Sequence, residues 1–202
     1  MFVSKREATM GKVYDGIDAG LEAFIGRQHL FFVGTAPNSL DGHLNISPKG
    51  LDTFRILGPK SVAYLDLVGS GIETVAHIRE NGRLTILFCA FEGRPLILRL
   101  YGRGRVVEPG DADWPGLIAE FPDYPGARSV VVMAVERIAD SCGFAVPLYE
   151  FKGDRSQLVD YANNKGPDGL EQYKAQKNRA SIDGLDGLRM EQPHGERVRR
   201  GG

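Results

Sequence analysis

Leu84-Thr-Ile-Leu-Phe-Cys-Ala-Phe91 and Leu96-Ile-Leu-Arg-Leu-Tyr-Gly-Arg-Gly-Arg-Val-Val107 are two apolar, β-rich runs on either side of a turn that begins at Glu92-Gly93. Two such runs around a short turn are typical of neighbouring antiparallel strands. Further strand candidates, separated by turn-forming residues, lie at 30–34, 44–47, 61–67 and 129–138. This spacing predicts an antiparallel barrel.

Helical patterns occur between and after these strands. Helices are predicted, in chain order, at 13–26, 71–81, 114–121, 158–164 and 170–178. Ser70 and Glu73 have the spacing of a capping box, which predicts Ser70 as the N-cap of the helix over 71–81. The fold class is therefore mainly β with flanking helices, and a helical extension begins at about residue 150.

Length and charge set the broad class of the protein. A chain of 202 residues fits one domain, predicted over 1–190, and residues 191–202 read as a disordered basic tail. Lys and Arg number 25 against 26 Asp and Glu, so no net positive field favours nucleic acid or a membrane surface. Without a long apolar run or a signal peptide pattern, we expect a cytoplasmic protein whose partner is a small molecule.

Cysteine and histidine patterns give no metal site. Cys89 lies in an apolar run and Cys142 in Asp-Ser-Cys-Gly, so both are interpreted as free thiols, and buried thiols are the simplest reading. The four histidines share no metal-ligand spacing, and no hydrolase Gly-x-Ser-x-Gly motif occurs. We therefore expect neither a structural metal nor a hydrolytic triad.

Two segments have residues suited to holding an anion. In Asn45-Ile46-Ser47-Pro48-Lys49-Gly50 a predicted strand ends in a hydroxyl and a cation, which suit a phosphate, although the pattern also fits a solvated turn. In Ser70-Gly71-Ile72-Glu73-Thr74 small residues open a helix, whose free N–H groups attract anions, although the pattern also fits a plain N-cap.

A third segment is a basic and aromatic stripe on one strand. Alternation along Arg99-Leu-Tyr-Gly-Arg-Gly-Arg105 places Arg99, Tyr101, Arg103 and Arg105 on one face and the glycines on the other. Glycines in a strand allow a ligand or a second chain to approach closely. The stripe is similar to a nucleic-acid face, but no basic surplus elsewhere supports that function.

The order of these segments resembles the FMN-binding split-barrel family of pyridoxamine 5'-phosphate oxidase-like proteins. The segments that carry the resemblance are 45–50, 64–66, 70–74 and 99–103. It covers roughly residues 15–140, and residues 141–147 resemble members of an uncharacterised bacterial branch. The resemblance implies a split β-barrel and a homodimer with FMN in the groove between subunits.

The resemblance also implies which residues bind FMN. The phosphate would be held by the end of one strand and by the loop after the next, and the flavin ring would lie along the first strand with the adjoining strand beside it. A partner strand would complete each site. The implied residues are Asn45, Ile46, Ser47, Lys49, Tyr64, Leu65, Asp66, Ser70, Gly71, Thr74 and, from the partner strand, Arg99, Tyr101 and Arg103.

The implied activity is that of a flavin-dependent oxidoreductase acting on an unidentified small molecule. Since the flavin carries the chemistry, no catalytic side chain is assigned. Genuine pyridoxamine phosphate oxidases carry an Arg/Lys-rich phosphate loop and a C-terminal Arg- and His-bearing motif. This chain has Ser-Gly-Ile-Glu in the loop and lacks the terminal motif, so vitamin B6 oxidation is not expected.

Two other cofactors remain open on the same fold. Haem or another tetrapyrrole would need His29, His43, His77 or His194 to reach the iron. The deazaflavin F420 would need a basic groove for its acidic tail, which Arg99, Arg103 and Arg105 could form. The helix-to-loop pattern at 178–183 suggests a lid over the site, and packing on the dimer is the alternative.

Overall fold

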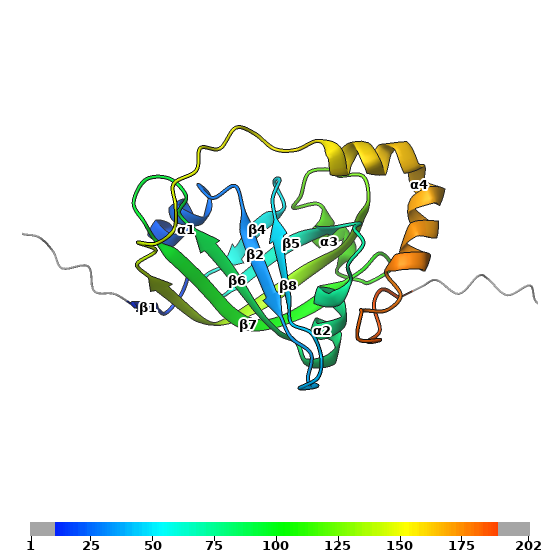
Figure 1. Cartoon of the computed structure of the whole chain (residues 1–202), viewed down its shortest axis with the longest axis horizontal. Helices are drawn as coiled ribbons and strands as arrows, with labels where there is room; N and C mark the ends of the chain where they lie inside the picture. The colour runs from blue at the N-terminus through cyan, green and yellow to red at the C-terminus, as the bar shows by residue number, and fades with distance from the viewer. Residues whose placement is uncertain (1–10, 190–202) are drawn as a thin grey trace, which may run out of the picture.

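An antiparallel eight-stranded sheet forms most of the computed structural model, which describes residues 11–189 (Figure 1). The strands follow the order β3-β2-β6-β7-β8-β5-β4, and β1 pairs with β8. Their bounds are β1 Val13–Tyr14, β2 Phe31–Thr35, β3 Asn45–Lys49, β4 Phe54–Gly58, β5 Ser61–Leu67, β6 Arg83–Cys89, β7 Ile97–Val107 and β8 Ala127–Ser141. The predicted class, a mainly β split barrel with flanking helices, is confirmed.

The β6–β7 hairpin forms as its sequence predicts. Leu84 pairs with Gly102 and Cys89 with Ile97, so the two long runs lie side by side in antiparallel register. Along β7, Leu98 and Leu100 are buried while Tyr101 and Arg103 are exposed. The predicted division of β7 into a basic outer face and an apolar inner face is therefore confirmed.

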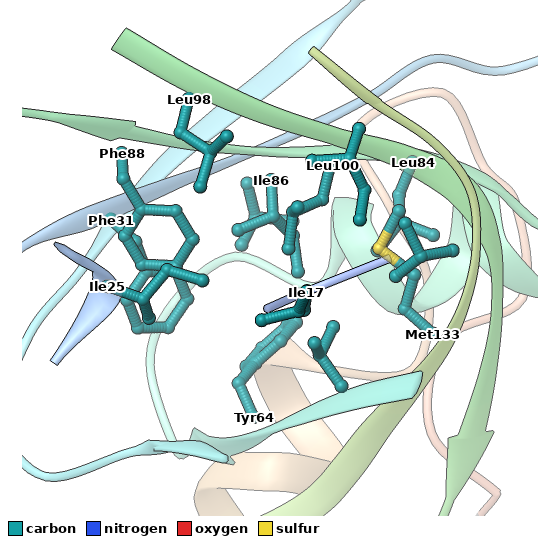
Figure 2. Close-up of a cluster of buried hydrophobic side chains, with 14 of the residues drawn as sticks. Ile17, Ile25, Phe31, Tyr64, Leu84, Ile86, Phe88, Leu98, Leu100 and Met133 are labelled. Atoms are coloured by element: carbon teal, nitrogen blue, oxygen red, sulfur yellow. The ribbon is translucent and has the colours of Figure 1, made fainter. Parts of the chain in front are cut away.

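The core of the barrel is filled by inward-facing residues of the strands and by apolar side chains from the helices that flank them. Figure 2 shows Phe31, Phe88 and Tyr64 among the aliphatic side chains of this cluster. The Phe31 ring lies 5.8 Å from both other rings, in tilted or edge-on contact. Such aromatic pairs add to the free energy gained by burying the rings.

Strand β5 is apolar on both faces because both are covered. Val62 and Tyr64 face the barrel core, whereas Ala63 and Leu65 pack in a second cluster under α3, Trp114–Ile118. A strand covered on both faces reads as a continuous apolar run rather than an alternating one. This explains the sequence of 61–67 and leaves Asp66 as its one buried charge.

Three local expectations need correction. The helix predicted over 13–26 is only α1, Ala19–Ile25, because Asp18 accepts the Leu21 N–H as the N-cap and residues 13–14 pair with β8. The helix predicted from 71 is α2, Glu73–Asn81, with Ile72 at the N-cap position and no side-chain cap, so the capping box at Ser70 is wrong. Strand β4 was not predicted.

The chain beyond β8 lies outside the barrel. Residues 142–156, which we call the strap, run without regular structure along one end of the barrel to α4, Gln157–Lys177 (Figure 1). Helix α4 is interrupted at Gly166, with φ of 67°, and Pro167 follows, so its two halves correspond to the two predicted helices. The predicted basic tail, 191–202, lies outside the described residues.

After α4, a short hook over 178–189 packs against the β2–β3 hairpin and the start of α2. Asp183 accepts hydrogen bonds from the backbone and the ring of His43, and the Ile182 N–H donates to Glu73. The Asn178 side chain donates to the Gly69 carbonyl. Among the helices of residues 11–189, none has the length and apolarity needed to cross a membrane.

Candidate functional site

A cavity of about 790 Å³ opens where the ends of β3 and β5 meet the loop before α2. The strap and the first residues of α4 close its other side. We call it the polar cavity, because Ser47, Lys49, Thr74 and Arg128 all line it. Its volume lies within the range of roughly 300–1,000 Å³ that is usual for ligand and cofactor sites.

A buried ion-pair network lies in the wall of the polar cavity. The Asp66 carboxylate is 2.7 Å from Lys49 Nζ and 2.7 Å from Arg128 Nε, and both Asp66 and Arg128 are at most 5% exposed. Burial alone would raise the pKa of Asp66, but the two cations outweigh it and lower that pKa to about 2. The cluster holds two cations against one carboxylate, so it carries a positive charge into the cavity wall.

The same network shapes the loop between β5 and α2. Arg128 donates to the carbonyl oxygens of Gly69 and Gly71 at 3.2 and 2.8 Å, and Asn178 donates to Gly69 as well. Since these carbonyls are turned toward Arg128 and Asn178, the loop is held by side chains from β8 and the hook. The loop therefore has one defined conformation at the cavity edge.

Two hydroxyl groups complete the donors of the cavity. Asn45 Nδ2 donates to Ser47 Oγ at 3.1 Å and to Thr74 Oγ1 at 2.9 Å, which links β3 to the first turn of α2, and Ser47 Oγ donates to Asn45 Oδ1 at 3.4 Å. A hydroxyl that accepts one hydrogen bond keeps its own proton for another. No described acceptor takes the Thr74 proton, so it is available to a ligand.

Glu73 places a negative charge at the same edge. Its carboxylate lies close over Gly71, since a Cβ added to this glycine would be 2.6 Å from Glu73 Oε2. The other carboxylate oxygen, Glu73 Oε1, accepts the Ile182 N–H at 3.4 Å. It does not cap α2. The carboxylate lines the cavity and opposes an anionic ligand there.

The structure gathers part of the set implied by the resemblance. Ser47, Lys49, Leu65, Gly71 and Thr74 line the polar cavity, and Asn45 and Asp66 are hydrogen-bonded to them. Their role in binding a cofactor stays a prediction.

The other implied residues lie away from the polar cavity. Ile46 is 71% exposed on the opposite face of β3, and Ser70 is exposed without lining the cavity. The Tyr64 side chain points into the barrel core (Figure 2), where burial raises its pKa well above 10, so only its backbone remains for a ligand.

The arginine stripe of β7 also lies outside this cavity. Arg99 donates to Ser141, and Arg103 donates to the Asn81 carbonyl and lies 3.5 Å from Glu136. Tyr101 is exposed beside them. Their implied role concerned a partner subunit and stays a prediction. Arg105, which together with Arg99 and Arg103 could form the basic groove for F420, is paired with Asp113 at 2.8 Å, so acidic side chains offset part of the positive charge of these arginines.

Arg128, His29 and Phe151 also line the cavity, although none of them was among the predicted FMN contacts. One feature of the sequence pointed to Arg128: it is a charged residue directly before the apolar run 129–134. An arginine buried there needs a carboxylate partner. No such feature pointed to His29 and Phe151, because their rings meet only through the strap, with centroids 3.7 Å apart and planes within 6°.

The histidines do not converge on one site. His77 is fully buried with Nδ1 2.9 Å from Thr35 Oγ1, and His43 is paired with Asp183. His29 stacks on Phe151, and His194 lies outside the described residues. Within residues 11–189, no three His, Cys, Asp or Glu side chains are grouped to hold a metal ion. Cys89 and Cys142 are free and half-buried.

The hook over 178–189 contributes no residue to the lining of the polar cavity, whereas the strap does. The segment suggested as a lid, 178–183, packs on α2 and the β2–β3 hairpin instead. Within the described part of the chain, the covering role therefore falls to residues 151–158.

This chain matches a family model and a relative among known proteins. Residues 17–142 match the family model described as pyridoxamine 5'-phosphate oxidase. The chain is 38% identical over 194 residues to the pyridoxamine 5'-phosphate oxidase family protein ustO of Aspergillus flavus, covering 87% of this chain and 77% of that protein. Because this relative is fungal, the placement in a bacterial branch finds no support.

Solved structures give weaker similarities. A variant of HupZ from Group A Streptococcus is 25% identical with a TM-score of 0.49, covering 61% of this chain and 98% of that one. A protein of Clostridium acetobutylicum related to general stress protein 26, of the pyridoxinephosphate oxidase family, is 16% identical with a TM-score of 0.39. That match covers 58% of this chain and 82% of the other.

Proposed function

Because the chain belongs to the pyridoxamine 5'-phosphate oxidase family, we propose that it is an FMN-binding oxidoreductase whose polar cavity holds the flavin phosphate. The observation that carries this proposal is the donor set of the cavity. Lys49 keeps two N–H donors beyond its bond to Asp66, and the hydroxyls of Ser47 and Thr74 face the same space. This set fits a phosphate group.

The residues in and beside the cavity have different roles in this proposal. Lys49 neutralises the phosphate, Thr74 donates a hydrogen bond to one of its oxygens, and Ser47 donates another by giving up its 3.4 Å bond to Asn45 Oδ1. Arg128 and Asp66 hold Lys49 and the 69–71 loop in place. Leu51, Leu65 and Phe151 exclude water from the apolar part of the cavity. When bound, the flavin supplies hydride or single-electron chemistry, and no side-chain nucleophile is needed.

We also propose that the protein acts as a homodimer. Leu40, Leu44 and Ile46 on the β2–β3 hairpin and Ile182 on the neighbouring hook are each more than 70% exposed. Large apolar side chains gathered on one exposed region mark interaction surfaces. Sedimentation velocity of the protein, with Leu44→Asp as the disrupting variant, measures the oligomeric state directly.

The decisive experiment compares FMN with riboflavin, which lacks the phosphate. Flavin fluorescence quenching gives the Kd of each ligand for the wild-type protein, Lys49→Ala and the control Lys60→Ala. Lys60 is exposed and forms no ion pair with any described residue. We expect Lys49→Ala to weaken FMN binding by about 10- to 100-fold, the value of a charge-assisted hydrogen bond, while riboflavin binding changes little.

Two results would count against this function. If the wild-type protein leaves FMN fluorescence unchanged up to millimolar flavin, the chain is not an FMN protein. If FMN binds but Lys49→Ala binds FMN and riboflavin with unchanged affinities, the phosphate lies elsewhere.

A further inference from the structure

A second and larger cavity, of about 1010 Å³, lies beside the polar cavity under the same strap. We call it the aromatic cavity, because six phenyl and phenol rings line it. They come from β1, α1, β2, the β6–β7 turn and the strap, and they belong to Tyr14, Phe24, Phe32, Phe91, Tyr149 and Phe151. None of the four segments to which the family resemblance assigns FMN contacts forms this lining.

The two cavities share one wall. His29, Leu30 and Phe151 line both of them, and the rings of His29 and Phe151 are stacked 3.7 Å apart within 6° of parallel. Flat rings therefore already pack face to face at the boundary. A ligand in the aromatic cavity would be separated from the polar cavity only by this stack and Leu30.

The strap is held loosely over the aromatic cavity. Its Tyr149 N–H donates to the Phe91 carbonyl and its Phe151 N–H to Glu92, each at 3.0 Å. Over 152–155 no described hydrogen bond ties the strap backbone to the barrel. Lifting Tyr149 and Phe151 away from the barrel would break these two hydrogen bonds and the ring contacts with Phe91 and His29, and would give a ligand a route inward.

The charges around the aromatic cavity do not favour an anion. Arg27 and Arg94 lie on its rim, but Glu92, Glu150 and Asp140 line it as well. Asp140 accepts hydrogen bonds from Tyr14 Oη at 2.6 Å and from the Lys12 N–H at 2.8 Å. Burial, followed by the bond to Asp140, raises the pKa of Tyr14 to about 12, so this phenol stays neutral.

We propose that the aromatic cavity binds a neutral, planar aromatic molecule. The lining of rings supplies stacking and edge contacts for such a molecule, and the mixed charges of the rim give no net attraction for an anion. The binding itself is independent of any cofactor. That the bound molecule is the substrate, reaching the flavin past Phe151, rests on the proposed function.

A pair of fluorescent probes tests this proposal. N-phenylnaphthylamine is neutral and built from two flat ring systems, and anilinonaphthalene sulfonate carries the same rings with a negative charge. We expect the neutral probe to bind the wild-type protein at least about 10-fold more tightly, and Phe91→Ala or Tyr149→Ala to weaken it by about 10-fold. Phe144→Ala is the matched control, because Phe144 lies on the same strap, is 72% exposed and lines neither cavity.

A second measurement locates the neutral probe without any mutation. Ring currents from the bound probe should shift the methyl NMR signals of Leu30 and Leu96, which line the aromatic cavity, and leave those of Leu57 unchanged. Equal weakening by Phe144→Ala and Tyr149→Ala, or unshifted Leu30 and Leu96 signals, would overturn the proposal.

The failure of this proposal can be told apart from failure of the flavin function. Lys49→Ala should bind the neutral probe with wild-type affinity, because Lys49 does not line the aromatic cavity. In the FMN-loaded protein, the probe should shift the flavin absorption bands, since only the His29–Phe151 stack and Leu30 intervene. If the probe binds but the flavin absorption bands do not shift, the aromatic cavity is a binding site but not the substrate site.

Discussion

The Asp66→Asn substitution tests whether the ion-pair network organises the polar cavity. In the native protein Asp66 accepts from Lys49 and Arg128 at 2.7 Å each and is 2% exposed. Asparagine keeps the shape of the side chain but removes its charge. Arg128, 5% exposed, would then be left buried with no carboxylate beside it.

The expected loss can be estimated in two ways. Removing one partner of a buried ion pair typically costs about 3–5 kcal/mol, because the other charge stays buried. The pKa of Asp66, lowered from 3.8 to about 2, corresponds by itself to roughly 2 kcal/mol of stability. Because the folded-state pKa is below the unfolded value, this stability is present above pH 3.8 and is lost as the pH falls toward 2.

Urea unfolding without added flavin measures both effects. We expect Asp66→Asn to lower the free energy of unfolding by about 3 kcal/mol at neutral pH, and this deficit to shrink by roughly 1 kcal/mol at about pH 3. Asp41→Asn is the matched control, because Asp41 is exposed and its carboxylate has no described partner. A deficit below about 1 kcal/mol, or one that stays constant on acidification, would refute the reasoning.

Three further predictions follow from single contacts. Glu73→Gln removes a negative charge from the lining of the polar cavity and should tighten FMN binding about fivefold, but leave riboflavin binding unchanged. Burial, partly opposed by nearby carboxylates, lowers the pKa of His77 below its ordinary value of 6.5. As the pH falls below 6.5, the unfolded chain binds a proton at this histidine before the folded protein does, so the free energy of unfolding decreases. His77→Gln should therefore lose less stability than the native protein between neutral pH and about pH 5 in urea unfolding, and equal losses would count against this. Gly102→Ala would place a Cβ 2.0 Å from the Ala134 carbonyl oxygen and should lower stability by about 3 kcal/mol or more, whereas Gly116→Ala, which meets no atom within 4 Å, should be close to neutral in thermal unfolding.

Part of the candidate site could be read from the sequence because its residues follow local patterns. Ser47 and Lys49 alternate along the end of a strand, and Thr74 follows small residues at the start of a helix. The capping box failed at the same place, because α2 begins at Glu73 with Ile72 at the N-cap position, and the Glu73 carboxylate accepts the Ile182 N–H of the hook, 109 residues away. A local motif gives no information about such a competing partner.

What the sequence alone determined is the class of fold and the family. Alternating or continuous apolar runs, divided by turn residues, define strands through contacts between near neighbours. The order of four short segments, three on strands and one at the start of a helix, carries the family resemblance. The tertiary structure decided which charges meet and what lies under the strap. Arg128 and Asp66 are 62 residues apart, and His43 and Asp183 are 140 apart, so only the folded chain brings them together. The aromatic cavity likewise exists only because the strap returns across the barrel, since its six phenyl and phenol rings come from five separate segments.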